Sequence, residues 1–230
     1  MCGRFQLSVK GREISERFNV EVFDGMYKPS YNCAPAQNLV VVTAKGPGFV
    51  QLMRWGLIPK WSSNSGKPAT PLINSRSETI LEKPAFRDAF RMRRCLVPAN
   101  GFYEWKNGAV KIPYRFHAED NSLFAMAGIW EEGRGPDQKP VCSFSILTTE
   151  ANKVMQDVHH RMPVILAPED EERWLLDNDT ASLLELLKPA NEGKLRKYPV
   201  SSKVNNTRND DESLINPIEV FPGDLFSLDV

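Results

Sequence analysis

Short hydrophobic runs rich in β-branched and aromatic residues dominate the first two thirds of the chain. Their length and composition are typical of β-strands rather than of helices. The predicted strands are Asn38–Thr43, Phe49–Trp55, Arg94–Val97, Phe102–Trp105, Tyr114–His117, Leu123–Trp130 and Val141–Thr148. Such a series of short strands predicts antiparallel sheets.

One connection between these strands has a specific turn signal. Asn107-Gly108 lies between the run Phe102–Trp105 and the residues Val110-Lys111-Ile112. Both central residues of a type I′ turn need positive φ, which Asn and Gly adopt more readily than other residues. The sequence therefore predicts a β-hairpin with a type I′ turn at Asn107-Gly108.

Helical signals are fewer and predict short helices at the periphery of the sheets. Each has a capping residue, a proline in its first turn, or apolar side chains four positions apart. The predicted helices are the segment from the cap Ser8 to Phe18, Ala151–Val158, the segment that starts at Pro168, and Leu183–Leu187 with Thr180 as its cap.

Length and composition predict one domain. The chain has 230 residues, 41% of them hydrophobic, which is enough for one sizeable core, and it has no internal repeat or linker. We expect one domain over residues 1–230, with too little pattern after about Asn216 to place that tail. No window approaches the roughly 18 consecutive apolar residues of a membrane span, and the start does not resemble a signal peptide. We therefore expect a cytoplasmic protein that has no membrane partner.

The net charge and the spacing of the cysteines limit the kinds of binding site and reaction that the sequence predicts. The formal net charge of zero excludes coating of nucleic acid by bulk attraction, so any DNA site must be a focused patch. The four cysteines are far apart and form none of the paired spacings that hold zinc or mark a redox dithiol: Cys2, Cys33, Cys95 and Cys142. We expect reduced thiols, no metal site and no cofactor.

The start of the chain, Met1-Cys2-Gly3-Arg4-Phe5, is the most informative stretch. A small second residue such as Cys permits removal of Met1, and Cys2 would then carry both a free α-amine and a thiol. The amine, whose ordinary pKa is about 7.7–8.0, can attack an aldehyde to give an imine, and the thiol can close that imine to a thiazolidine. A retained Met1 would block this chemistry, and a cysteine at position 2 of an arbitrary protein is more often incidental.

Further short motifs follow this start in a fixed order. They are Asn32-Cys33-Ala34-Pro35, Arg54-Trp55-Gly56-Leu57-Ile58-Pro59, Ile73-Asn74-Ser75-Arg76-Ser77-Glu78-Thr79, Arg94-Cys95-Leu96-Val97-Pro98-Ala99, Gly101-Phe102-Tyr103-Glu104-Trp105 and His159-His160-Arg161-Met162-Pro163. With Cys2-Gly3-Arg4-Phe5 they resemble the SOS-response-associated peptidase family, whose members are abasic-site processing proteins. The resemblance extends from residue 2 to about Asn206. It implies an α+β fold, a β-rich single domain of antiparallel sheets with a barrel-like core and a few peripheral helices.

The resemblance implies that Cys2 is the residue that crosslinks to the ring-opened sugar of an abasic site. Asn74 matches the family's active-site asparagine, which we expect to hold the Cys2 amine and a nearby phosphate through its amide. Arg76 should pair with a phosphate. Because side chains alternate along a strand, Asn74 and Arg76 would point to one face, and Glu78 would continue it.

Glu104 and His159 complete the implied catalytic set. Glu104 matches the family's catalytic glutamate, and ring opening and imine formation both need a group that shuttles protons. Without the resemblance, Glu104 fits a solvated residue on a sheet edge about equally well. His159 matches the family's histidine as a proton carrier, although the neighbouring His160 leaves the choice between the two open.

A DNA-binding surface is predicted from cations and aromatic side chains near these motifs. Arginines would contact phosphates, and aromatic rings would stack on a base or beside the missing one. The predicted residues are Arg4, Arg54, Trp61, Asn74, Arg76, Phe86 and Arg87, and the resemblance adds Pro35, Thr148, Ser201 and Asn205. A dense cluster of arginines also fits a solvated helix face. Its members are Arg87, Arg91, Arg93 and Arg94, and the solvated face is the preferred interpretation for Arg91 and Arg93.

The expected partner is single-stranded DNA that contains an abasic site, bound by a monomer. Removal of its own Met1 and a lyase side reaction through the imine are also expected. Two other functions fit parts of the sequence. Met1-Cys2-Gly3 also opens class II glutamine amidotransferases, in which the thiol attacks an amide, but their glutamine-binding motifs and ammonia-using partner domain are not evident. In a non-catalytic DNA-binding module, replacement of Cys2 by Ala would leave DNA retention intact.

Overall fold

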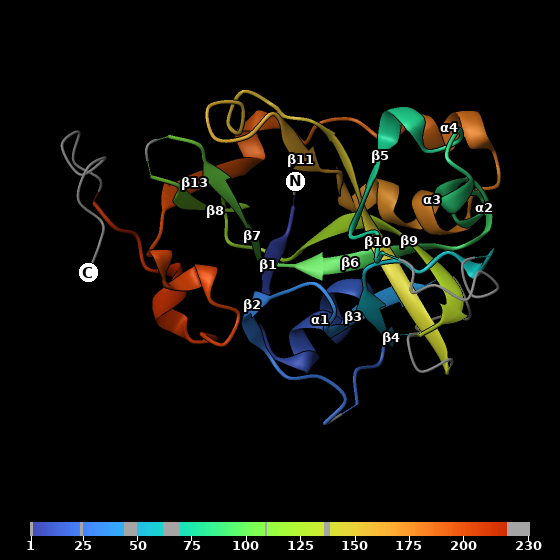
Figure 1. Ribbon diagram of the computed structural model, residues 1–230, viewed down its shortest axis with the longest axis horizontal. Coiled ribbons are helices and arrows are strands. Elements are labelled where there is room, and N and C mark those ends of the chain that lie inside the picture. The colour runs from blue at the N-terminus through green and yellow to red at the C-terminus, as the bar shows by residue number, and fades with distance from the viewer. Residues whose placement is uncertain are drawn as a thin grey trace.

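The computed structural model describes residues 2–23, 25–43, 50–61, 70–108, 110–135 and 139–219 (Figure 1). One sheet is five-stranded and antiparallel throughout. In spatial order its strands are β13 (Leu195–Pro199), β8 (Ile112–Ala118), β7 (Gly101–Lys106), β1 (Arg4–Leu7) and β2 (Ser30–Cys33). The strand at the start of the chain, β1, therefore lies inside this sheet between β7 and β2.

The second sheet is eight-stranded and contains a closed barrel. Its strands are β3 (Asn38–Thr43), β4 (Val50–Trp55), β5 (Asn74–Arg76), β6 (Arg94–Ala99), β9 (Phe124–Arg134), β10 (Pro140–Glu150), β11 (Arg161–Pro163) and β12 (Ile165–Leu166). β10 pairs with both β4 and β9, and the path β4-β3-β6-β9 returns to it. The predicted fold, a β-rich α+β domain with a barrel-like core, is confirmed.

All the strands predicted from the hydrophobic pattern are present. The prediction of purely antiparallel sheets is wrong in one respect, because β10 pairs in parallel with β4 and with β5. Phe144 lies opposite Trp55, and Ile146 lies opposite Asn74. Local alternation predicts a strand but not which distant strand becomes its neighbour, and parallel neighbours are always distant in sequence.

The predicted hairpin is present, but its turn is not of type I′. β7 and β8 pair with Lys106 opposite Ile112, so the connection consists of residues 107–111. Neither Asn107 nor Gly108 is among the described residues with positive φ, which a type I′ turn requires of both. The longer connection removes the geometric need for a two-residue turn.

Four α-helices occur in the described part of the chain: α1 (Gly11–Phe18), α2 (Pro84–Met92), α3 (Glu171–Leu176) and α4 (Thr180–Glu185). α2, α3 and α4 gather on the right of Figure 1, beside the barrel. α3 follows a 3₁₀ turn at Pro168–Asp170, as its proline predicted. None of these helices is long and apolar enough to cross a membrane.

Two predicted helix caps are wrong. The cap of α1 is Lys10 rather than Ser8, and the Glu13 carboxylate accepts the Lys10 backbone N–H at 2.8 Å. Thr180 is the first residue of α4, and the side chain of Asp179 caps it. A carboxylate at the start of a helix satisfies the N–H groups that have no partner within the helix.

The predicted helix at Ala151–Val158 is also wrong, because this segment is a series of turns. The Asn152 Oδ1 accepts the N–H of Met155 at 3.2 Å, and its amide donates to the Ala190 carbonyl at 3.0 Å. An asparagine that bonds to nearby backbone competes with the helical hydrogen-bond ladder. Apolar spacing alone did not reveal this competition.

Aromatic packing joins the two sheets at β1. The Phe5 ring of β1 lies 5.1 Å from Trp55 of β4, and Trp55 stacks at 6.3 Å on Phe144 of β10. All three side chains are fully buried, so this contact fixes the start of the chain against the barrel core. Trp55 is therefore a core residue, whereas the Trp105 side chain is only half-buried.

The last described residues pair with the end of β13. Val200 forms a β-bridge with Pro217, and the Ile218 N–H donates to the Pro199 carbonyl at 3.0 Å. The predicted loss of pattern after about Asn216 falls mostly on residues 220–230, which lie outside the described residues.

Candidate active site

Cys2 lies two residues before β1, in the interior of the protein. β1 pairs with β7 so that Arg4 is opposite Tyr103, and the same register places Gly3 opposite Glu104. The Cys2 side chain is fully buried, and its Sγ lies 3.9 Å from the Arg4 carbonyl oxygen. The second residue of the chain is therefore an interior residue and not a frayed end.

Asn74 holds the backbone of Cys2. Parallel pairing with β10 fixes β5, and the Asn74 Nδ2 donates to the Cys2 carbonyl at 2.9 Å. The Asn74 Oδ1 is buried and accepts no hydrogen bond from any described residue. This oxygen can accept a hydrogen bond from an amine at Cys2, because it lies in the same amide group that already binds this residue.

Glu104 is only 3% exposed and lies on β7, between β1 and β8. The alternative interpretation, a solvated glutamate on a sheet edge, is therefore wrong. Burial raises the pKa of the Cys2 thiol, and the negative charge of Glu104 raises it further. The Cys2 thiol is thus protonated at neutral pH, and the carboxylate is close enough to influence it.

His159 completes the cluster from the turn before β11. Its Nδ1 lies 2.9 Å from the Arg161 backbone nitrogen and 3.1 Å from the Arg161 carbonyl oxygen, so the backbone of Arg161 fixes the orientation of the ring. Burial lowers the pKa of His159, while the charge of Glu104 opposes that shift. The structure thus brings together the four residues predicted to be catalytic: Cys2, Asn74, Glu104 and His159.

His160 differs from His159 in its surroundings. The two rings stack with centroids 4.5 Å apart, but His160 is exposed to solvent and His159 is half-buried. The charge of Glu104 acts to raise the pKa of His159. These positions favour His159 as the residue that faces Cys2 and Glu104.

Several residues predicted to bind DNA have accessible side chains. Trp61 is 61% exposed, Arg76, Arg87 and Asn205 are exposed, and Pro35 and Arg54 are half-buried. Arg76 shares the accessible face of β5 with Asn74, since the intervening Ser75 is buried. Arg87 lies on α2 beside Asp88, away from the N-terminus in Figure 1.

Two of the predicted DNA contacts are wrong because the side chains are inside the protein. Phe86 packs in the hydrophobic core on the inner face of α2, so it cannot stack on a base. Thr148 is fully buried on β10, where its Oγ1 donates to the Ser75 carbonyl.

Two other predicted DNA contacts have structural hydrogen bonds. Arg4 donates to Asn32 Oδ1 at 2.8 Å and to the carbonyls of Val204 and Asn205 at 2.7 Å and 3.0 Å. Ser201 Oγ accepts the Lys203 N–H at 3.3 Å and so caps a 3₁₀ turn at Ser202–Asn205. These contacts attach the turn that carries Asn205 to the start of the chain.

The solvated interpretation of the arginine cluster is wrong for Arg94. This side chain is buried and donates to carbonyls at the ends of two helices: Phe90 and Arg91 of α2, and Trp174, Leu175 and Asp177 at the end of α3. Arg93 pairs with Glu131 at 2.6 Å, while Arg87 and Arg91 are exposed on α2. Sequence carries no direct signal that an arginine beside a helix turns inward.

Sequence reasoning also missed Arg161, which is 7% exposed. Its guanidinium binds Glu78 through two hydrogen bonds, and Glu78 lies in a 3₁₀ turn (Ser77–Thr79) rather than on an extension of β5. The position of Arg161 within His159-His160-Arg161-Met162-Pro163 was the available signal, because that motif also contains the candidate His159.

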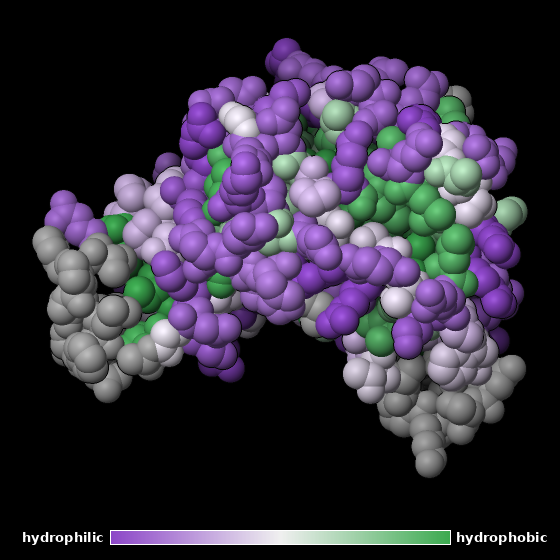
Figure 2. Space-filling view, turned by 90° about the horizontal axis from the view of Figure 1, so that it is seen from above, coloured by the Kyte–Doolittle hydropathy of each residue, from purple (hydrophilic) through white to green (hydrophobic). Residues whose placement is uncertain are grey.

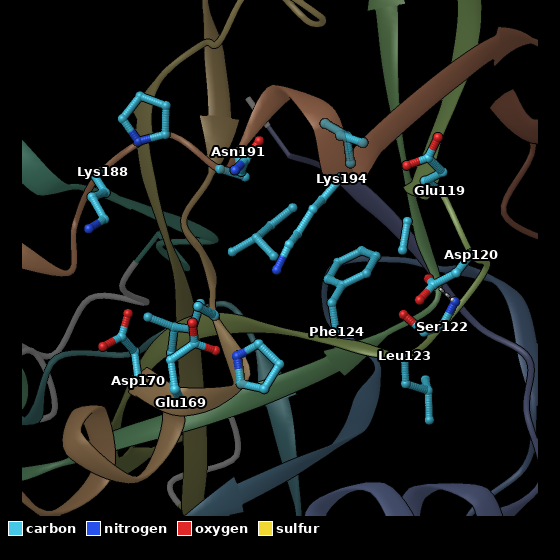
Figure 3. A pocket seen from close by; sticks show the side chains of 18 of the residues that line it. Glu119, Asp120, Ser122, Leu123, Phe124, Glu169, Asp170, Lys188, Asn191 and Lys194 are labelled. Carbon is cyan, nitrogen blue, oxygen red and sulfur yellow. Dashed lines mark hydrogen bonds between the residues drawn. The ribbon is translucent and has the colours of Figure 1, made fainter.

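The cavity with the largest described volume does not coincide with this site. It measures about 500 Å³ and lies between the β8–β9 turn and the segment after α4, as Figure 3 shows. Lys194 and Glu169 project into it above an apolar floor that includes Phe124. No predicted catalytic residue lines it, so cavity volume alone would have located the wrong part of the molecule.

The chain is thus a β-rich domain with a closed barrel, in which the cysteine at position 2 is buried in the interior. The model of the family described as SOS response associated peptidase (SRAP) matches residues 1–207. The chain belongs to this family.

Relatives and solved structures cover nearly the whole chain. It is 41% identical over 222 residues to the abasic site processing protein YoqW of Bacillus subtilis (strain 168), covering 94% of this chain and 99% of that protein. It is 31% identical over 234 residues to the abasic site processing protein HMCES of Gallus gallus, covering 86% and 68%. A crystal structure of a protein from Bacteroides thetaiotaomicron matches with a TM-score of 0.84 and 28% identity, covering 95% and 100%.

Proposed function

We propose that this protein processes abasic sites in single-stranded DNA by forming a covalent crosslink through Cys2. The names of its relatives indicate abasic-site processing. The observation that carries the proposal for this chain is the buried position of Cys2, held by Asn74 and next to Glu104. An aminothiol at such a position can meet an aldehyde in a place from which bulk water is excluded.

The reaction begins with the amine. After removal of Met1, the neutral α-amine of Cys2 attacks the aldehyde carbon of the ring-opened sugar, and the hydroxyl of the adduct leaves as water to give an imine. The sulfur then bonds to the imine carbon, and the thiol proton moves to the nitrogen, which closes a thiazolidine ring. The raised pKa of the thiol supports this order, because a protonated thiol is a poor first nucleophile.

Neighbouring side chains supply the proton transfers. The Glu104 carboxylate lies near the thiol, so it can take the proton that the attacking amine loses and return it to the hydroxyl, which then leaves as water. The half-buried imidazole of His159 is a second group that can transfer protons during ring opening or reversal. β-Elimination from the imine would give a lyase side reaction, and ring closure to the thiazolidine competes with it.

The same thiol argues against an amidohydrolase. That reaction needs sulfur as the first nucleophile, and burial together with the charge of Glu104 raises the thiol pKa instead of lowering it. Crosslinking also predicts preference for single strands, since the sugar must reach a residue buried between β1, β5 and β7.

The test mixes the purified protein with single-stranded DNA that carries one abasic site, after mass spectrometry has shown whether Met1 is absent. Wild type should give a band that survives heat and detergent. Cys2→Ala should give none, and Cys2→Ser should give an adduct that is lost on heating but retained after borohydride reduction. Glu104→Gln should slow the band about 10- to 100-fold.

The matched control is Cys142→Ser, a half-buried thiol on β10 outside the candidate site, which should react like wild type. Duplex DNA should react poorly. A full-strength heat-stable band with Cys2→Ala contradicts the mechanism. Unchanged DNA retention by Cys2→Ala without any crosslink in wild type would identify a non-catalytic DNA-binding module.

A further inference from the structure

β13 has a free side in the five-stranded sheet. It stands at one end of the strand order, so among the described strands only β8 pairs with it. The Lys194 carbonyl and the Val200 N–H both form hydrogen bonds on the β8 side. Because hydrogen-bonding positions alternate along an antiparallel strand, the backbone groups of Arg196 and Tyr198 also face β8, and those of Lys197 face the free side.

The chain returns to this free side just before residue 220. Val200 forms an antiparallel bridge with Pro217, and the Ile218 N–H donates to the Pro199 carbonyl at 3.0 Å. If this antiparallel register continues, the next hydrogen-bonding position on β13, Lys197, falls opposite residue 220. The following residues then run along β13 toward its first residue.

The start of β13 borders the cavity of about 500 Å³ that Figure 3 shows. This volume lies within the range of about 300–1,000 Å³ that is typical of binding sites. Lys194 projects into the cavity, Leu123 and Phe124 contribute to its apolar lining, and Glu169 lies on the opposite wall. The cavity therefore suits a segment that carries an acidic residue on the Lys194 side and apolar side chains after it.

The sequence of residues 220–230 fits both the free side and the cavity. It reads Val220-Phe221-Pro222-Gly223-Asp224-Leu225-Phe226-Ser227-Leu228-Asp229-Val230. The continued register places Pro222 opposite Leu195. A proline has no N–H to donate there, and none is needed, because the Leu195 carbonyl already accepts from Arg196 Nη1 at 3.0 Å.

The same register places Gly223 opposite Lys194, so that Asp224 is the first side chain to reach the cavity. We propose that residues 220–230 dock on their own chain, where they extend the five-stranded sheet along β13 and fill this cavity. Asp224 lies against Lys194, and Leu225 and Phe226 cover the apolar lining. Since residues 217 and 218 are already bound at the other end of β13, the effective concentration of this segment is on the order of mM, which favours its own chain over a second copy.

Amide hydrogen exchange followed by NMR tests the pairing residue by residue. In wild type the Lys197 N–H should be protected, although it faces away from β8. In Leu225→Ser/Phe226→Ser, which removes two apolar contacts with the cavity, exchange at Lys197 should become at least about tenfold faster. The N–H groups of Arg196 and Tyr198, which face β8, should stay within about twofold of wild type.

Exchanging charges tests the position of the segment. Asp224→Lys and Lys194→Glu each bring like charges together, so each should speed exchange at Lys197 about fivefold. The double variant restores an opposite pair and should return to within about twofold of wild type. Phe23→Ser is the matched control for loss of an apolar side chain, since Phe23 is exposed and does not line the cavity.

Each result decides the inference, and none involves DNA or Cys2. If Lys197 exchanges as fast in wild type as in Leu225→Ser/Phe226→Ser, the docking is overturned. If protection of Lys197 rises with protein concentration, the segment comes from a second copy, which overturns docking on the same chain. If the double charge variant exchanges as fast as the single ones, the placement of Asp224 against Lys194 is overturned.

Discussion

Two buried arginines connect separate segments of the chain. Arg94 donates to carbonyls at the ends of α2 and α3, and Arg161 of β11 donates to Glu78 in the turn after β5 and to a carbonyl of β10. A guanidinium offers five donors in a fixed plane, so one side chain can satisfy several carbonyls at once. Burial lowers the pKa of Arg94, but the group remains charged at any physiological pH.

Replacing Arg94 tests this role at a single residue. Arg94→Met fills a similar volume but leaves carbonyls at two helix ends without donors. We expect a loss of about 3 kcal/mol in the free energy of unfolding, measured by urea denaturation. Arg87→Met, an exposed substitution on α2, should stay within about 0.5 kcal/mol of wild type. Equal effects of the two substitutions would show that the buried contacts contribute nothing specific.

Glu78 should make stability depend on pH. Its hydrogen bonds with Arg161 lower the pKa of this carboxyl group. The stabilisation is therefore complete above the ordinary value of about 4.3 and is lost as pH falls through the lowered pKa. We expect Glu78→Gln to reduce the free energy of unfolding by about 1 kcal/mol at neutral pH, a value limited by solvent screening.

That difference should shrink toward zero as the pH falls below the lowered pKa, where wild-type Glu78 also becomes neutral. Denaturation at several pH values measures it. Glu16→Gln is the control, because Glu16 pairs with Arg12 on the exposed face of α1 and should show a difference of only a few tenths of a kcal/mol. A Glu78→Gln difference that is constant with pH would contradict the ion-pair explanation.

Among the secondary-structure elements, four separate segments form the candidate site: the two residues before β1, then β5, β7, and the turn before β11. Antiparallel pairing with β7 places Cys2 near Glu104, and parallel pairing with β10 places Asn74 beside Cys2. Each segment is short and gains its position from longer strands of the sheets. The site is therefore as rigid as the sheets that hold it, which suits a reaction that needs fixed geometry.

The connection after β4 depends on a glycine. Gly56 has φ of +120°, and a Cβ at this position would lie 2.7 Å from the Pro71 Cβ. We expect Gly56→Ala to lower the free energy of unfolding by about 2–3 kcal/mol through both strain and contact. Gly108→Ala should be nearly neutral, since its nearest contact would be at 3.4 Å and its φ is not positive.

Thermal and urea denaturation of both variants check this pair of expectations. The comparison also tests the turn between β7 and β8. A large loss of stability in Gly108→Ala would indicate the positive φ of a type I′ turn after all, whereas a small one agrees with the longer connection.

At the scale of the whole molecule, zero net charge is combined with a largely hydrophilic surface. Figure 2 shows hydrophilic residues over most of one face, with a hydrophobic area toward the side where α2, α3 and α4 lie in Figure 1. Arg76 is exposed on the same face of β5 as Asn74, and Lys60 is also exposed, so both cations can reach a phosphate.

DNA affinity should therefore depend only moderately on salt. Contacts to about three phosphates of a single strand give a slope near −2 in a plot of log affinity against log salt concentration. Fluorescence anisotropy with Cys2→Ala, which does not react, measures the slope for single-stranded DNA. Arg76→Gln should make it shallower by about 0.7, while Arg87→Gln on distant α2 should leave it unchanged. A slope much steeper than −4 would indicate a broad basic surface that these residues do not explain.

The sequence by itself predicted the strands and the residues that the fold brings together around Cys2, and the aminothiol chemistry is proposed from it. Short β-rich runs predicted β3, β4, β6, β7, β8, β9 and β10, because alternation and side-chain shape act within a few residues of the chain. The order of motifs indicated the family and the four residues that the fold brings together. These signals are local or additive, so they can be read without knowing which segments touch.

Only the tertiary structure decided which strands are neighbours and which polar side chains are inside. The barrel closes through the parallel pairing of β10 with β4, a contact between distant segments. Phe86 was assigned to the surface by its residue type and Thr148 by the family resemblance, but burial depends on what packs over a side chain. The contacts of Arg161 with Glu78 and with the Thr148 carbonyl require β11 and β5 to lie on opposite sides of β10, because hydrogen bonds between distant residues form only after the chain has folded.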